Sequence, residues 1–122
     1  MEAQKNYEIK ELSLEFSLLL IDYLQKPGKE KTLLNPNQLL RSGTGIGANI
    51  REAQGAESRK DFVHKMKIAY KEAEESEYWI LLFKKSDPDP ILLILQDQIL
   101  QIKKMLGKII STSLKNMNKL AE

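Results

Sequence analysis

The sequence predicts an all-α protein, an antiparallel up-down four-helix bundle, on the basis of three observations. Leu, Lys, Glu, Gln and Ala dominate the 122 residues, and all five are good helix formers. Val63 is the only valine and there are three threonines, so the β-branched residues are almost all isoleucine and the sequence is poor sheet material. The four prolines lie in three places, at Pro27, at Pro36 and at the pair Pro88 and Pro90, and they divide the chain into helix-length segments.

The first predicted helix carries a wide apolar stripe and ends at Lys26-Pro27-Gly28. Alternating steps of three and four residues place one apolar set on a single helical face: Ile9, Leu12, Phe16, Leu19 and Tyr23. A second set widens this stripe: Leu18, Leu20, Ile21 and Leu24. We therefore expect this helix to bury two faces, one of them against a second subunit.

The second predicted helix opens with Asn35 as its N-cap and Pro36 at its first position, and Gly55 marks its exit. Its apolar face follows the same spacing: Leu39, Gly43, Ile46, Ile50 and Ala53. The three interior glycines are Gly43, Gly45 and Gly47. Each costs about 1 kcal/mol relative to alanine in a helix, so we expect a close helix crossing to compensate.

The third and fourth predicted helices have regular apolar faces. Ser58 and Asp61 form a cap at the start of the third helix, and Asp89 caps the fourth within the turn Asp87-Pro88-Asp89-Pro90. The face of the third helix is Phe62, Met66, Ala69, Ala73, Ser76, Ile80 and Phe83. The face of the fourth is Leu95, Ile99, Ile102, Leu106, Ile109 and Ser113. We expect residues 1–122 to form one four-helix domain.

Composition excludes several kinds of chemistry. The chain has no cysteine, so disulfides, thiolate zinc sites and cysteine nucleophiles are excluded. His64 is the only histidine, whereas di-iron bundle sites need two or more. The start of the chain has no signal-peptide pattern, and no apolar run approaches the ~20 residues of a membrane helix. We expect a cytoplasmic protein without membrane contact, and neither a metal nor another cofactor.

Two local patterns resemble ligand sites, but their sequence context favours structural roles. Gly43-Thr44-Gly45-Ile46-Gly47 lacks the preceding strand and the Gly-Lys-Ser/Thr of a phosphate-binding loop, so close packing is the preferred interpretation. Glu72 and Glu75 share a face, as a metal-binding pair would, but neither is followed by histidine at the di-iron spacing. We expect these glutamates at the surface or facing basic residues such as Lys71, Arg51 and Lys84.

Isolated residues of the third helix give no catalytic pattern. His64 lies off the apolar face, so we expect it at the surface. Tyr78 and Trp79 could stack on a nucleic-acid base, but buried packing in the core or at a subunit interface is the more common role. We therefore expect no enzymatic activity.

Two local runs of basic residues stand out against a net charge of only +2. The first contains five basic residues against Asp61: Arg59, Lys60, Lys65, Lys67 and Lys71. The second contains five lysines against Glu122: Lys103, Lys104, Lys108, Lys115 and Lys119. Either run could follow a phosphate backbone, although lysine-rich helix faces are more often solvated surface.

The central segment resembles a known family. Residues 41–79 read RSGTGIGANIREAQGAESRKDFVHKMKIAYKEAEESEYW, which is similar to the four-helix bundle family of 23S rRNA intervening sequences. The usual family pattern is RSGTSIGANI, so Gly45 stands where serine is common. Residues that match the motif carry no assigned role: Arg41, Ser42, Asn49, Arg51, Glu52, Ser58, Arg59, Asp61, Lys65, Lys71 and Glu72.

The resemblance implies a cytoplasmic bacterial protein that assembles as a homopentameric ring and has no established catalytic residues. It also implies kinship with the accessory protein of diversity-generating retroelements, which works beside a reverse transcriptase and its RNA.

We therefore expect a non-enzymatic oligomeric scaffold that binds RNA, DNA or a nucleic-acid-associated protein. The candidate contact residues are Arg41, Arg51, Arg59, Lys60 and Lys65. The alternative is a protein-protein adaptor without nucleic-acid binding, in which basic residues pair with Glu72, Glu75 and Glu77 across subunits.

Overall fold

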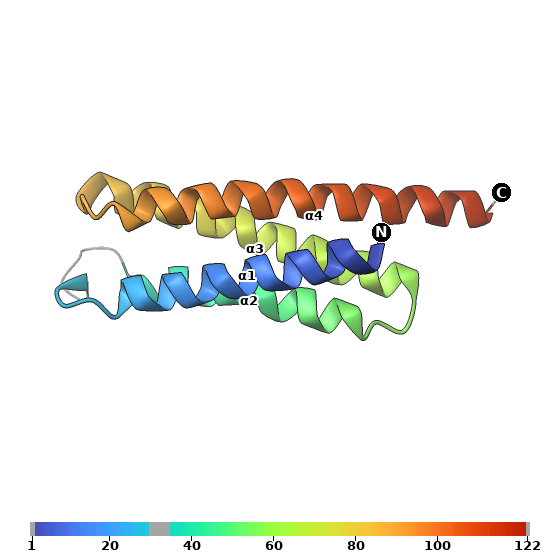
Figure 1. Cartoon of the computed structure of the whole chain (residues 1–122), viewed down its shortest axis with the longest axis horizontal. Coiled ribbons are helices and arrows are strands. Elements are labelled where there is room, and N and C mark those ends of the chain that lie inside the picture. The colour runs from blue at the N-terminus through green and yellow to red at the C-terminus, as the bar shows by residue number, and fades with distance from the viewer. Residues whose placement is uncertain (1, 30–34, 122) are drawn as a thin grey trace.

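The computed structural model describes residues 2–29 and 35–121, and this part of the chain contains four α-helices and no strand (Figure 1). Helix α1 spans Glu2–Leu24 and α2 spans Pro36–Gln54. Helix α3 spans Arg59–Ser86 and α4 spans Ile91–Ala121. The all-α prediction and the four helix-length segments are thus confirmed.

The predicted N-caps are present. The side-chain oxygen of Asn35 accepts a hydrogen bond from the backbone N–H of Asn37 at 2.9 Å, and Pro36 follows in the first turn of α2. Ser58 accepts from the N–H of Asp61 at 3.0 Å. Asp89 accepts from the N–H of Ile91 at 3.1 Å. Each cap satisfies one of the N–H groups that the first turn of a helix leaves unpaired.

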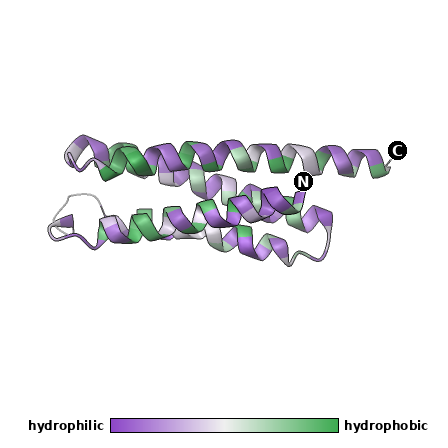
Figure 2. Ribbon diagram, in the orientation of Figure 1, coloured by the Kyte–Doolittle hydropathy of each residue, from purple (hydrophilic) through white to green (hydrophobic). Residues whose placement is uncertain are grey.

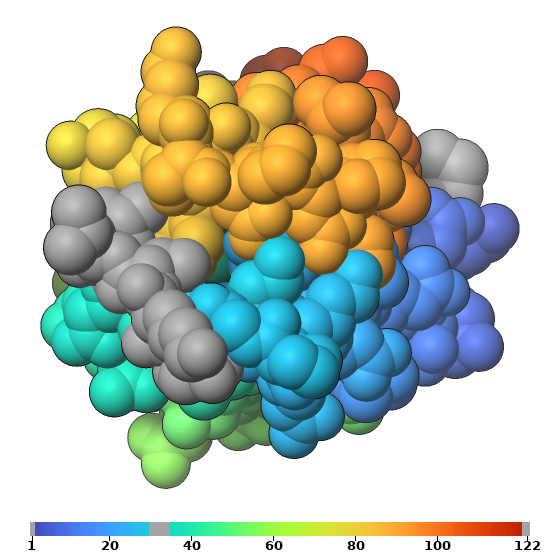
Figure 3. Space-filling view, turned by 90° about the vertical axis from the view of Figure 1, so that its left-hand side faces the viewer, coloured from blue at the N-terminus to red at the C-terminus, as the bar shows by residue number. Residues whose placement is uncertain are grey.

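The four helices pack side by side within the chain, and each contacts two main neighbours. Helices α1 and α3 both pack against α2 and α4. Figure 3 shows one end of this arrangement, where the end of α1 and residues 25–29 lie against the turn between α3 and α4. Apolar and polar segments alternate along all four helices, and the first turns of α4 are strongly apolar (Figure 2).

The core contains the apolar faces that the spacing predicts. Every predicted face residue of α2, α3 and α4 is buried. In α1 the centre of the buried face is shifted, because Ser13 and Leu20 are buried whereas Leu12 and Leu19 are only partly buried. Tyr23 meets Phe83 edge to face, with ring centres 6.2 Å apart.

The glycines of α2 allow the close crossing that the sequence predicts. A Cβ atom at Gly43 would overlap Leu20 Cδ2 of α1 and would lie 3.2 Å from Phe16 Cε2. Gly47 lies against Ser13, whose Oγ would be 3.4 Å from such an atom. The α1 side chains therefore occupy space that a larger residue at position 43 would need.

A pair of serines provides a buried polar contact between α2 and α3. Ser76 Oγ donates to Ser42 Oγ at 2.8 Å, and both residues have no exposed surface. Ser42 Oγ lies 3.4 Å from the carbonyl oxygen of Leu39, which can accept its proton. Buried hydroxyls are costly without partners, so this pair favours one register of the two helices.

Candidate nucleic-acid interface

The five basic residues expected to contact nucleic acid lie on two helices, and Arg41 is engaged with carboxylates. Its Nη1 atom lies 3.3 Å from Glu72 Oε2, and its Nη2 atom forms an ion pair with Glu75. These contacts join α2 to α3. Arg41 therefore acts first as a bridge between helices, although about half of its side chain remains exposed.

The other four candidate residues lie at the end of α2 and in the first turns of α3. Arg59 lies 3.6 Å from Glu2, and Lys65 lies 3.5 Å from Glu52. Arg51 and Lys60 are exposed and form no ion pair within the described residues. Arg51 is also ten residues, or about 15 Å, from Arg41 along α2. Three of the five candidate residues thus contact carboxylates within this chain, and Arg41 lies apart from Arg51 along α2.

The acidic cluster of α3 faces a basic residue, as expected, but this residue is not one of the three named examples. Glu72 and Glu75 face Arg41 rather than Lys71, Arg51 or Lys84. The Nε1 atom of Trp79 donates to Glu75 Oε2 at 3.1 Å. A Cβ atom at Gly45 would lie 2.6 Å from Glu72 Oε2, so the glycine leaves room for this carboxylate. No cluster of three or more His, Cys, Asp and Glu side chains suited to a metal ion occurs in the described residues.

Two further predictions on α3 have different outcomes. His64 is exposed, as expected. Trp79 is half-buried, but Tyr78 is 58% exposed, so Tyr78 does not lie in the core of this chain, and its place at a subunit interface stays a prediction. Tyr78 lies on the exposed line of α3 that also contains Lys67, Lys71 and Glu74.

Lysines gather instead around two grooves that flank α4. The α3–α4 groove is lined by Lys67, Tyr70, Lys71, Glu74, Gly107, Ile110, Ser111, Leu114, Lys115 and Asn118. The α1–α4 groove is lined by Lys5, Lys104, Gly107, Lys108, Ser111, Thr112 and Lys115. Gly107, Ser111 and Lys115 line both grooves, so the two form one basic surface across α4. None of the ion pairs in the described part of the chain involves its lysines.

Gly107 marks the middle of this surface. A Cβ atom built there meets no atom within 4 Å, in contrast to Gly43. The bundle itself therefore does not require a glycine at position 107. The missing side chain exposes the backbone of α4 to a close approach from outside.

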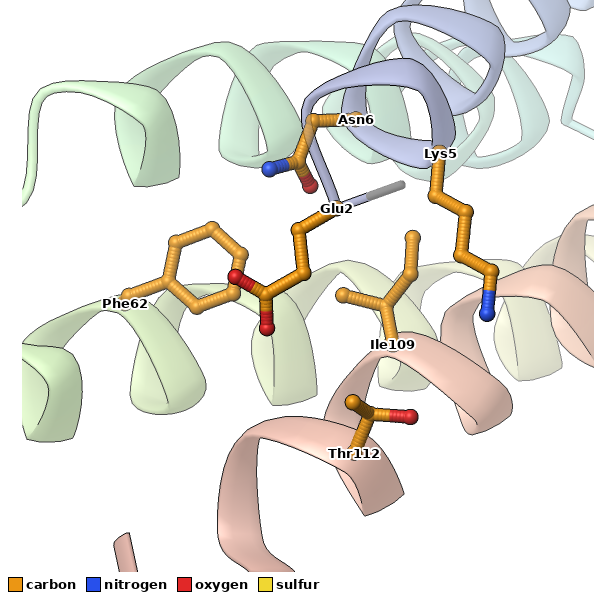
Figure 4. Close-up of a pocket in the computed structure, with 6 residues that line it drawn as sticks. All are labelled: Glu2, Lys5, Asn6, Phe62, Ile109 and Thr112. Carbon is orange, nitrogen blue, oxygen red and sulfur yellow. The ribbon is translucent and has the colours of Figure 1, made fainter. Parts of the chain in front are cut away.

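A smaller cavity lies where the start of α1 meets α3 and α4 (Figure 4). Glu2 and Asn6 extend from the first turns of α1 toward the ring of Phe62 and toward Ile109. The volume of this cavity is about 100 Å³. Sites for small molecules and cofactors occupy about 300–1,000 Å³, so this cavity is too small for a cofactor.

A compact group of charged residues closes the other end of the bundle. Asp87 accepts hydrogen bonds from the hydroxyl of Tyr23 and from Lys29 Nζ, the latter at 2.7 Å. Asp89 pairs with Lys26 at 3.0 Å and with Lys29 at 3.4 Å. Lys29 and both aspartates are almost fully enclosed, with 11–13% of each side chain exposed. This end network links the residues after α1 to the turn between α3 and α4 (Figure 3).

The end network shifts the acidity of its members. Burial opposes ionisation of Asp87, but hydrogen bonds from Lys29 and Tyr23 outweigh it, so the pKa of Asp87 lies below its ordinary value of 3.8. A backbone hydrogen bond at the start of α4 and one from Lys26 lower the pKa of Asp89. The hydrogen bond to Asp87 raises the pKa of Lys29. Burial, together with the bond to Asp87, raises the pKa of the Tyr23 hydroxyl. The network is thus a structural device that keeps its charges paired.

Fold and surface together define an all-helical bundle with lysine-lined grooves on one side. The sequence profile described as 23S rRNA-intervening sequence protein matches residues 5–108. The chain belongs to this family. Its structure is similar to the crystal structure of a protein of unknown function from the S23 ribosomal protein family of Bacteroides thetaiotaomicron, with a TM-score of 0.80. The two chains are 39% identical, and the match covers 88% of this chain and 98% of that one.

No curated protein matches the chain. Within the described residues, no helix combines the length and the apolar character needed to cross a membrane.

Proposed function

We propose that this protein is a non-enzymatic scaffold, an antiparallel up-down bundle that assembles with further copies of itself and binds RNA through a basic surface. The observation that carries the proposal is the set of lysines around the two grooves that flank α4. Unpaired surface lysines favour a polyanion, because binding releases the counterions that surround its phosphates. A nucleic-acid-associated protein with an acidic face is the related partner.

Self-association is supported by the outer face of α1. Tyr7, Leu14 and Leu18 lie on this face and are 60%, 41% and 56% exposed. Ile21 and Leu24 of α1 and Leu40 of α2 line a further apolar groove beside it. Exposed apolar surface of this kind is typical of protein interfaces. We propose a closed ring, with five copies as the family resemblance implies and with the cytoplasm as its location.

The experiment that tests RNA binding is a fluorescence-anisotropy titration with structured RNA and DNA at low and near-physiological salt. Exchanging Lys67, Lys71, Lys104 and Lys108 for Gln is expected to weaken binding and to reduce its dependence on salt. A comparison set removes the five charges that the sequence analysis favours, and we expect a smaller effect there because three of these residues already contact carboxylates. That set is Arg41, Arg51, Arg59, Lys60 and Lys65. Equal affinity for all variants would refute RNA binding by this surface.

A protein-protein adaptor is the second candidate function. The exposed apolar residues of α1 favour it. Glu72 and Glu75 pair with Arg41, and Glu77 pairs with Lys103, within this chain. An adaptor predicts no saturable binding to RNA or DNA at near-physiological salt, and a defined protein partner that binds with fixed stoichiometry. The anisotropy titration therefore separates the two functions.

A further inference from the structure

The α3–α4 groove combines an apolar floor with a basic rim. Tyr70, Ile110 and Leu114 contribute apolar surface, and Lys67 and Lys71 stand one turn apart along α3. The groove has a volume of about 530 Å³. This volume lies within the range of sites that hold a small molecule.

The charges on the rim select an anion. Three lysines line the α3–α4 groove, and Glu74 is the only carboxylate among its lining residues. The exposed side chains of Lys67 and Lys71 extend from the α3 side, and Lys115 extends from the α4 side. An anionic group between the two helices would therefore meet ammonium groups from both sides.

The apolar floor selects a flat ring attached to that anion. Tyr70 is half-buried, and Lys103 Nζ lies 5.7 Å from the centre of its ring, a contact that helps to fix the ring in place. Aromatic side chains beside basic groups are the usual means of binding unpaired bases, whose faces are free to stack. A duplex presents its phosphates to such a surface but keeps its bases within the stack.

We propose that the α3–α4 groove binds an unpaired nucleotide of a single-stranded RNA, with the base against Tyr70 and its flanking phosphates at Lys67, Lys71 and Lys115. The strand then continues over the bare backbone at Gly107 toward the α1–α4 groove, whose lysines contact phosphates only. This inference rests on the proposed RNA-binding function and names the part of the RNA that the surface recognises.

The test compares two fluorescent strands of equal length and charge: an oligouridylate and a strand of the same backbone without bases. The wild-type protein is expected to bind the oligouridylate about tenfold more tightly, because stacking of a base on an aromatic side chain has this order of effect. Tyr70→Leu, which keeps an apolar residue at the floor, should remove most of this preference and leave binding of the baseless strand unchanged.

Two matched double variants locate the contact. Lys67→Gln with Lys71→Gln changes the α3–α4 groove, whereas Lys104→Gln with Lys108→Gln changes the α1–α4 groove. Each pair removes two exposed lysines one turn apart on a single helix, so neither should affect folding. The first pair is expected to abolish the preference for the oligouridylate. The second pair should weaken binding of both strands to the same extent. Glu74→Gln should strengthen binding by about threefold, because it removes the carboxylate from the rim.

Two results would overturn the proposal that the groove binds a base and would leave the proposed RNA binding intact. One is equal affinity of the wild-type protein for the two strands, and the other is equal effects of the two double variants. Tighter binding of a duplex of the same length would overturn it as well. Absence of saturable binding to either strand would overturn both the groove and the proposed function.

Discussion

Alanine at Gly43 and alanine at Gly107 are expected to change stability in opposite directions. Both glycines lie inside long helices, so both substitutions gain about 1 kcal/mol of helix propensity. At Gly107 the new methyl group meets no atom within 4 Å, and the full gain of about 1 kcal/mol should appear. At Gly43 the methyl group would overlap Leu20 and crowd Phe16, both fully buried.

The expected cost at Gly43 exceeds the gain. Overpacking of a core costs about 1–3 kcal/mol, so the net loss is about 1 kcal/mol and the two variants should differ by about 2 kcal/mol. Urea unfolding followed by circular dichroism measures this difference, with all samples at one protein concentration because self-association contributes to stability. A Gly43→Ala protein that is as stable as Gly107→Ala would refute the assignment of Gly43 to a tight crossing of α1 and α2.

Three further predictions concern the end network, the buried serines and self-association. The pKa values of Asp87 and Asp89 are lowered in the folded protein, so the unfolded chain binds protons more readily. The contribution of these two carboxylates to the free energy of unfolding is therefore fully present above about pH 4, and it is lost as the pH falls through their pKa values in the folded protein. Asp87→Asn should lower the unfolding free energy at pH 7 by about 2 kcal/mol and flatten this acid dependence in thermal melts; an unchanged acid profile would contradict the role of the network. Ser76→Ala should cost about 1 kcal/mol in urea unfolding, and a neutral result would mean that the hydroxyl pair does not stabilise the α2–α3 contact. Leu14→Gln with Leu18→Gln should reduce the mass measured by light scattering at micromolar concentration, whereas a wild-type monomer would contradict association through α1.

Most of the fold could be predicted from the sequence, because the boundaries of the helices depend on local chemistry. Asn35, Ser58 and Asp89 could be recognised as caps from their own and the following residues, and the periodic apolar faces define the core. The face of α1 was harder to assign, since apolar residues surround most of that helix. Its buried side depends on where α2 and α4 pack, which periodicity alone does not specify.

The candidate interface was less predictable, because it depends on which helices are neighbours. Both basic runs were visible in the sequence, but only the fold places Lys67 and Lys71 beside Lys115. Pairing of Arg41 with Glu72 and Glu75 likewise joins residues more than 30 positions apart. Gly107 is a local signal of this surface that the sequence analysis missed. It is a glycine between lysines, inside a segment of otherwise high helix propensity.

The length of α4 has a consequence for how the basic surface moves. Its last turns extend past the start of α1 (Figure 1), and the residues from Asn118 to Leu120 are exposed. Helix segments with few buried contacts open most often, so amide hydrogens here should exchange with solvent sooner than those around the buried Leu106. Lys115 lies within the last packed turn of the helix, just before the exposed residues. A strand bound there would slow this exchange, and the rigidity of the end of α4 would report on occupancy of the surface.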